Sequence, residues 1–310
     1  MRGVPSLILG KDDMELTGLY TFRNPVKLGY PVLEGYLSTI DMVDKAIVCY
    51  DPTSDDQTLE LVKAMELSPK YGHKTLTVPF EWPFSRVPGD GSVIGVATKY
   101  AVDQVTTSHV INIQSDEVYP VELSNSVREN WRDWVDAGYE AFKFKILHTE
   151  HNAQQFQGGE IWDGRKDTDM WRRGGLYNGR VGGAGYDHSF KMIKKCNATK
   201  LEHDAWSFSW EGFACGSVSV SELYPVIHLH DFHRDHLIDL RRNAADNLWT
   251  DRERFGNYKH DADQIEQTRE QWYNDPKWTN PHSPFEELLP DYVRPLIGKT
   301  TYVPRLELLK

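Results

Sequence analysis

A cluster of carboxylates follows an apolar run in the first part of the chain. Residues 45–50 form a short apolar segment that stops at Asp51, and Ser54, Asp55 and Asp56 follow within a few positions. A carboxylate at the end of a strand can accept hydrogen bonds from a ribose diol or from the N–H of a nucleobase. The same residues are equally typical of a turn that caps the following helix. Both interpretations stay open.

A second acidic pair follows the apolar run 109–113. Gln114 and Ser115 lead into Asp116 and Glu117. Two adjacent carboxylates at a sheet edge suit a hard divalent cation, because Mg²⁺ takes one or two protein carboxylates together with phosphate oxygens of a substrate. The alternative is a capped turn before a helix that begins at Pro120.

Four histidines lie close together near residue 230, namely His228, His230, His233 and His236. His228 and His230 would face the same side of a strand, while His233 and His236 would share a helix face. Imidazole is a common metal ligand, so one of these side chains could complete a cation site. At least two of them fit ordinary surface histidines, and a dedicated His-rich zinc site is a competing interpretation.

Alternating strand and helix patterns position these groups in the first half of the chain. Helical spacing of apolar residues begins at Pro31, after Asp56 and at Val93. Strand patterns cover 16–22, 45–50, 74–78 and 109–113. This order favours a mostly parallel sheet with covering helices, and ligands of such sheets gather at the carboxyl ends of the strands.

The second half has a different pattern. A helix is expected over 120–137, and the Gly-rich stretch 151–188 is expected to be a long loop with functional content. Strands are expected over 139–147, 189–195 and 225–229, and helices over 233–249 and 262–272.

Composition limits the classes of protein to consider. The 310 residues include 39% apolar and 26% charged side chains, which excludes a disordered chain. The net charge of −11 disfavours binding of nucleic acid over the whole surface. Three cysteines without a CxxC motif argue against a disulfide framework and predict a cytoplasmic protein. No apolar run approaches 18 residues and the first residues do not form a signal peptide, so no transmembrane segment is expected.

The order and spacing of these motifs resemble the family-2-like glycosyltransferases of the GT-A fold. Residues 16–118 carry most of the resemblance, through Ser54-Asp55-Asp56-x-Thr58 and through Gln114-Ser115-Asp116-Glu117, a variant of the Asp-x-Asp motif. The stretch 225–236 adds a late apolar strand ending in His, and 140–224 matches only loosely.

The resemblance implies an α/β fold, with a GT-A-like, Rossmann-type, mostly parallel sheet flanked by helices. Residues 1–232 would form the catalytic domain, with a nucleotide-sugar half over 16–118 and an acceptor half over 119–232. Residues 233–310 would be a helical C-terminal extension packed on it.

The resemblance also assigns roles to residues. Asp51 would hold the base or ribose, Asp55 or Asp56 would support that pocket, and Asp116 would ligate Mn²⁺ or Mg²⁺ with His228 or His230 as second ligand. Gln114 stands where the family has its first Asp, so the cation loses one carboxylate. The remaining nucleotide-sugar contacts would come from Thr21, Phe22, Arg23, Asn24, Gln114 and Ser115.

The function implied is transfer of a hexosyl or pentosyl group from a nucleotide-diphosphate sugar, such as a UDP-sugar, to an acceptor hydroxyl. An inverting reaction needs one general base, for which Asp187, just before an expected strand, is the first candidate and Glu160 the second. A glycan, a small molecule and a modified nucleic-acid base all stay open as acceptors. The alternatives are a sugar- or nucleotide-binding module without turnover and a zinc hydrolase.

Overall fold

The computed structural model describes residues 14–84, 92–150, 155–156, 176–177, 180–181, 186–196, 199, 201, 205, 207–209, 213–217, 224–229, 289–297, 299 and 301–310. For 147–150, 155–156, 176–177, 180–181 and 186–188 it describes the backbone alone.

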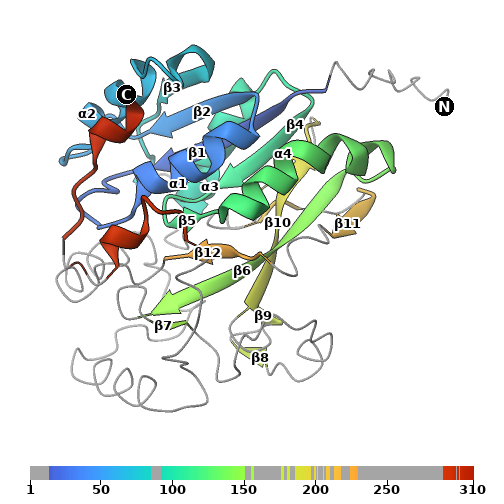
Figure 1. Ribbon diagram of the computed structural model, residues 1–310. Helices are drawn as coiled ribbons and strands as arrows, with labels where there is room; N and C mark the ends of the chain where they lie inside the picture. The colour runs from blue at the N-terminus through green and yellow to red at the C-terminus, as the bar shows by residue number, and fades with distance from the viewer. Residues whose placement is uncertain are drawn as a thin grey trace.

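A long mixed sheet forms the centre of the molecule (Figure 1). Its strand order is β3-β2-β1-β4-β10-β6-β12-β5. The first four of these are parallel, β10 runs antiparallel to both neighbours, β12 is parallel to β6, and β5 is antiparallel to β12. The bounds are β1 Leu16–Phe22, β2 Lys45–Tyr50, β3 Thr75–Pro79, β4 His109–Ile113, β5 Glu117–Val118, β6 Ala141–Glu150, β10 Tyr186–Lys194 and β12 Val226–His228.

Shorter strands lie beside this path. β7 (Gln155–Phe156) and β11 (Cys215–Ser217) both pair with β6. β8 (Leu176–Tyr177) and β9 (Arg180–Val181) form a separate hairpin. The stretch expected to be one long loop therefore contains short strands and the start of β10.

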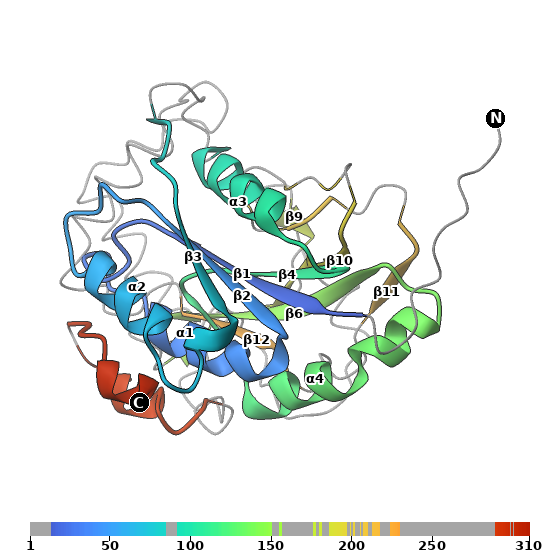
Figure 2. The same ribbon diagram turned by 90° about the horizontal axis from the view of Figure 1, so that it is seen from above.

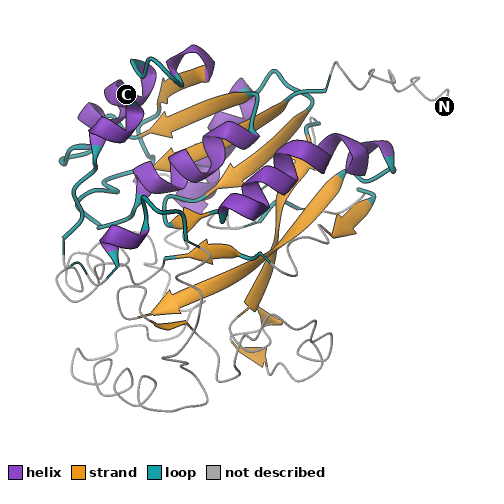
Figure 3. Ribbon diagram, in the orientation of Figure 1, coloured by secondary structure: helices purple, strands orange, loops and turns teal. Residues whose placement is uncertain are grey.

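Helices cover both faces of the sheet, which explains why its central strands are apolar runs (Figures 2 and 3). Helix α3 (Ser92–Gln104) covers one face, and α1 (Val32–Thr39), α2 (Thr58–Glu66) and α4 (Val121–Asp136) cover the other. Leu16 and Tyr20 of β1 pack in the core under α1, whereas Leu19 packs in the core under α3. No helix within the described ranges is long and apolar enough to cross a membrane.

The α/β architecture with a mostly parallel sheet is confirmed, and the elements expected in the first half match those observed to within a few residues. One difference is informative. β5 is a strand at a position where only a turn was expected, because its two residues are too few to show a pattern. The expected helices 233–249 and 262–272 lie outside the described residues.

The C-terminal segment packs on the α1 face of the sheet (Figure 1). Its described part holds two short 3-10 helices, Arg294–Leu296 and Leu306–Leu309. Glu34 of α1 is fully buried and accepts a hydrogen bond from the Tyr302 hydroxyl at 2.8 Å. Arg305 lies 3.5 Å from the other oxygen of that carboxylate. Burial raises the pKa of Glu34. The contacts of Tyr302 and Arg305 with this carboxyl group join the C-terminal segment to α1.

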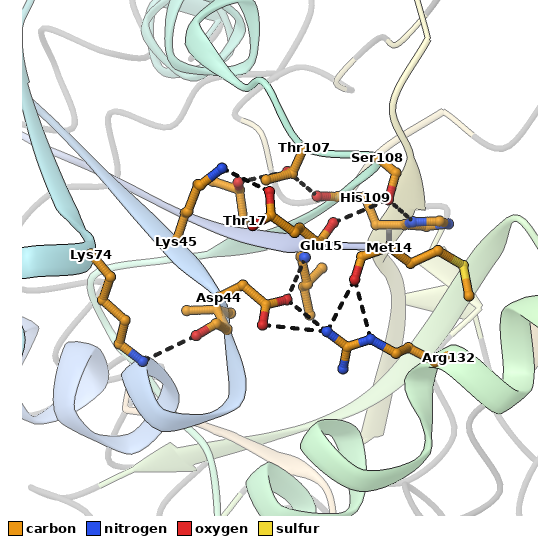
Figure 4. Close-up of polar contacts among 12 residues, drawn as sticks. Met14, Glu15, Thr17, Asp44, Lys45, Lys74, Thr107, Ser108, His109 and Arg132 are labelled. Carbon is orange, nitrogen blue, oxygen red and sulfur yellow. Dashed lines mark hydrogen bonds and ion pairs between the residues drawn. The ribbon is translucent and has the colours of Figure 1, made fainter. Parts of the chain in front are cut away.

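A cluster of polar side chains lies at the amino-terminal ends of β1 and β4 (Figure 4). Arg132 of α4 donates two hydrogen bonds to the Met14 carbonyl and two to the Asp44 carboxylate, and Asp44 also accepts from the Leu16 N–H. His109 is buried nearby, where burial lowers its pKa to about 4. These groups fix the start of β1 at the edge opposite the strand ends predicted to bind ligands.

Helix α1 meets β5 at unusually close range. A Cβ atom on Gly35 would lie 2.6 Å from the Glu117 carbonyl oxygen. The Ser38 hydroxyl, one turn later, accepts a hydrogen bond from the Tyr119 N–H at 3.0 Å. Gly35 and Ser38 therefore hold the two-residue strand that follows Asp116.

Replacing Gly35 with alanine should lower the free energy of unfolding by about 1–3 kcal/mol, because the methyl group overlaps backbone that cannot move without disturbing β5. Urea denaturation measures this. Gly95→Ala, at a half-exposed position of α3, is the matched control and should raise stability by up to about 1 kcal/mol, as alanine normally does in a helix. Equal effects of Gly35→Ala and Gly95→Ala on the free energy of unfolding would contradict the close approach of α1 to β5.

Candidate active site

The residues predicted to carry chemistry gather at the carboxyl edge of β2, β1 and β4. Phe22 pairs with Tyr50 and Tyr20 pairs with Ile113, so the three strands end side by side. The loops that start at Arg23, Asp51 and Gln114 therefore leave the sheet at the same edge.

Asp51 lies at this edge with a carboxylate that is 1% exposed. Its Oδ1 accepts from the Thr53 N–H at 2.8 Å and from the Thr53 hydroxyl at 2.7 Å. Its Oδ2 accepts from the Trp82 N–H at 3.3 Å and lies 3.0 Å from the Arg23 Nε. The side chain predicted to contact a nucleotide directly thus already contacts three protein residues.

Asp55 and Asp56 join the first two loops. Lys27 donates from its Nζ to Asp55 at 2.6 Å and from its backbone N–H to Asp56 at 2.8 Å. The hydrogen bond from Lys27 lowers the pKa of Asp55. Asp56 also accepts from the N–H and hydroxyl of Thr58 at the start of α2. The hydrogen bonds from Lys27 join the loop that starts at Arg23 to the loop that starts at Asp51.

The opening nucleotide loop is shorter than predicted. Thr21 and Phe22 belong to β1 and are buried, because they are the last residues whose backbone pairs with β2. Only Arg23 and Asn24 of the four predicted residues lie beyond the strand. Asn24 has a positive φ of 49° and its side chain accepts from the Asp55 N–H at 2.9 Å.

Asp116 and His228 come together at the far side of the same edge, although they are distant in sequence. β12 pairs with β5 so that His228 lies opposite Glu117, and the Leu229 N–H donates to the Asp116 carbonyl at 2.7 Å. The His228 Nε2 lies 3.0 Å from an Asp116 Oδ2, and each side chain is 16% exposed. Burial alone would lower the pKa of His228, but the Asp116 carboxylate and Glu117 hold it above its ordinary value.

The Asp116–His228 contact is an ion pair in which His228 donates to Asp116, and a cation bound here would have to replace the proton on the His228 Nε2. Ligand atoms about 2.1 Å from an octahedral ion and at right angles to each other are about 3.0 Å apart. The observed separation of oxygen and nitrogen has this value. Within the described ranges no group of three or more His, Cys, Asp and Glu side chains is arranged to hold a metal.

Glu117 points away from this pair and into the protein. Its Oε1 lies 2.5 Å from the Lys191 Nζ, and neither side chain is exposed. Lys191 also donates to the Gln114 Oε1 at 3.1 Å, and the Gln114 N–H donates to the Glu117 Oε2 at 3.1 Å. Asp116 and Glu117 therefore do not offer two carboxylates to one cation, because the Glu117 carboxylate is paired with the ammonium of Lys191 on β10.

Lys191 was missed by the sequence analysis. The signal was present, since Lys191 stands between Phe190 and Met192 in an expected central strand. A charged residue in such a strand is almost never buried without a partner.

Several predicted residues are not placed with this site. Asp187 lies on β10, where its backbone pairs with Ile146 of β6. Glu160, His230, His233 and His236 lie outside the described residues. Ser115 is half-exposed in the turn before Asp116.

No protein-family model and no curated protein sequence matches the chain. The solved structures that align with the chain include glycosyltransferases, at low similarity. S. aureus TarS 1–349 in complex with UDP-GlcNAc is 14% identical with a TM-score of 0.38, and the match covers 92% of this chain and 84% of that one. The Pyrobaculum calidifontis mannosyltransferase PcManGT, in complex with GDP-Man and Mn²⁺, is 17% identical with a TM-score of 0.32, over 42% of this chain and 35% of that one. At these values the likeness assigns neither a substrate nor a residue role to this chain.

Removing one partner of the buried pair should be costly. Glu117→Ala leaves the Lys191 ammonium buried without a counter-charge and should lower the free energy of unfolding by about 3–5 kcal/mol. Asp116→Ala, at a partly exposed position, should cost less. Urea denaturation compares them.

The double variant Glu117→Gln with Lys191→Met is the control, because removing both charges should recover most of the lost stability. A double variant as unstable as Glu117→Ala would mean that altered side-chain packing, and not the unpaired charge, lowers the free energy of unfolding.

Proposed function

We propose that this chain is a glycosyltransferase that moves a sugar from a nucleotide-diphosphate sugar to an acceptor hydroxyl. The observation that carries the proposal is the meeting of Asp116 and His228 at 3.0 Å on the carboxyl edge of the sheet. The loops at Arg23 and Asp51 share that edge, so a nucleotide held there has its diphosphate directed toward this pair. A pure binding module needs no cation site of this kind.

Asp116 and His228 would hold Mn²⁺ or Mg²⁺. When bound, the cation would neutralise the negative charge that develops on a leaving diphosphate. Glu117 would not be a ligand, since it is paired with Lys191. With only two protein ligands, affinity for the cation should depend on phosphate oxygens to complete the coordination.

The general base for an inverting reaction would be Asp187, with Glu160 as the second candidate. Asp187 sits on the strand next to β6, whose neighbour β12 carries His228. An Asp187→Asn change should abolish sugar transfer and leave donor binding intact, because an amide cannot take the proton of the acceptor. Normal turnover in this variant, measured as release of nucleoside diphosphate, would exclude Asp187 and direct attention to Glu160.

Thermal unfolding with a panel of nucleoside diphosphates and their sugars, with and without Mn²⁺, tests the proposal. A ligand at 100 times its Kd adds about 2.7 kcal/mol of stability. We expect stabilisation by at least one nucleotide, larger with Mn²⁺, and slow turnover of its sugar. Binding without turnover would instead favour a binding module, and tightly bound zinc in the purified protein would favour a hydrolase.

Asp116→Ala should weaken Mn²⁺-dependent nucleotide binding at least about tenfold, since one of two protein ligands is lost. Titration calorimetry with and without Mn²⁺ measures the dependence. Asp103→Ala is the control, because this carboxylate is exposed at the end of α3, where the chain approaches the amino edge of β4. If Asp116→Ala and Asp103→Ala bind nucleotide equally well with Mn²⁺, the cation does not sit at Asp116.

A further inference from the structure

Helix α1 receives its amino-terminal cap from the far end of the chain. The first N–H groups of a helix have no partner within it, and the N-cap residue Pro31 makes no side-chain capping bond. The Leu33 N–H instead donates to the Tyr302 hydroxyl at 3.2 Å, and that hydroxyl donates onward to Glu34 at 2.8 Å. Both hydrogen bonds are buried, and Tyr302 is 6% exposed. A residue 269 positions away in sequence therefore completes the start of α1.

The C-terminal segment has further contacts beside this cap, and it lies against α1 and α2 (Figure 1). Arg305 lies 3.5 Å from the Glu34 carboxylate. Leu296 is buried in the same apolar core as Val118 of β5. The segment therefore contacts α1 through polar side chains and shares a core with the short strand that follows Asp116.

Helix α1 transmits its position to β5 through backbone contacts. Gly35, one turn from the cap, leaves no room for a side chain, since a Cβ atom there would lie 2.6 Å from the Glu117 carbonyl oxygen. Ser38 accepts a hydrogen bond from the Tyr119 N–H at the end of β5. Protein interiors are close-packed, so a shift of α1 must move β5 or open a gap beside it. Asp116 directly precedes β5, so such a shift reaches its carboxylate.

We propose that Tyr302 is a positioning residue for the cation site. By capping α1 it keeps β5 in place, and with it the Asp116 carboxylate that would bind the cation together with His228. The proposal rests on the proposed function and adds that docking of the C-terminal segment is coupled to binding of the cation with its nucleotide. Coupling between two binding events is reciprocal, so each event must favour the other by the same factor.

The variant Tyr302→Phe tests this role, because it keeps the buried ring and removes both hydrogen bonds. Calorimetry on the full chain measures the Kd of whichever of UDP and GDP binds the wild type more tightly, with and without Mn²⁺. Binding with Mn²⁺ should be about threefold to thirtyfold weaker in the variant. The Kd without Mn²⁺ should change less than about twofold, since the cap acts on the cation ligand. An unchanged Kd with Mn²⁺, or an equal loss with and without Mn²⁺, would overturn the proposal.

The variant Ser68→Ala is the matched control. Like Tyr302, the Ser68 hydroxyl accepts one hydrogen bond from a backbone N–H, that of Tyr71, and donates one, to the Leu309 carbonyl of the C-terminal segment. Ser68 follows α2 and does not cap α1. Ser68→Ala should therefore lower the free energy of unfolding, measured in urea, but leave the Kd with Mn²⁺ within about twofold of the wild type. Equal weakening of binding by Ser68→Ala and Tyr302→Phe would refute a specific role of Tyr302.

Hydrogen exchange on the wild type tests the coupling from the opposite side and needs no variant. The Leu33 N–H is held by the Tyr302 hydroxyl, so its exchange requires that contact to open. Saturating Mn²⁺ and nucleotide should slow this exchange at least about threefold. Exchange at Leu33 that is unchanged in the presence of bound nucleotide and Mn²⁺ would overturn the proposal. Absence of any nucleotide binding by the wild type would instead refute the proposed function, so the two failures are distinguishable.

Discussion

The buried ion pair between Lys191 and Glu117 is the contact on which the candidate cation site depends. It joins β10, in the middle of the sheet, to β5, at its edge, although β6 and β12 lie between them. The same ammonium binds Gln114, and the Glu117 carboxylate accepts from the Gln114 backbone, so both ends of the turn are fixed. Asp116 lies inside that turn and is directed toward His228 as a result.

A buried ion pair is weak support for stability, because removing two charges from water costs about as much as their attraction returns. Its effect here is on geometry. β5 has two residues, too few to hold a position by strand pairing alone. The Lys191–Glu117 ion pair and the close contact of Gly35 with the Glu117 carbonyl hold β5 in place in addition to its strand pairing. The C-terminal segment reinforces α1 through buried Glu34, so parts of the chain far from Asp116 contribute to its placement.

Much of the fold could be predicted from the sequence because the pattern is local. The runs at 16–22, 45–50 and 109–113 are mostly apolar, as is typical of strands covered on both faces. Placing Asp51 and Asp116 at strand ends followed directly from these runs, whereas the expectation that a late strand would bring a histidine to Asp116 came from the family resemblance. The distinct roles of Asp116 and Glu117 could not be predicted, because they depend on Lys191 and on the pairing of β5 with β12.

The carboxylates at the two ends of the candidate site differ in burial. Asp51 is buried and contacts Thr53, Trp82 and Arg23, whereas Asp116 is partly exposed beside the His228 imidazole. A buried carboxylate must be fully satisfied by the protein, and once satisfied it is a rigid support and not a binding group. A partly exposed carboxylate keeps acceptor capacity and can exchange water for a cation or a ligand. Burial therefore distinguishes Asp51 and Glu117, which are enclosed by protein partners, from the partly exposed Asp116, a distinction that residue type and spacing alone do not contain.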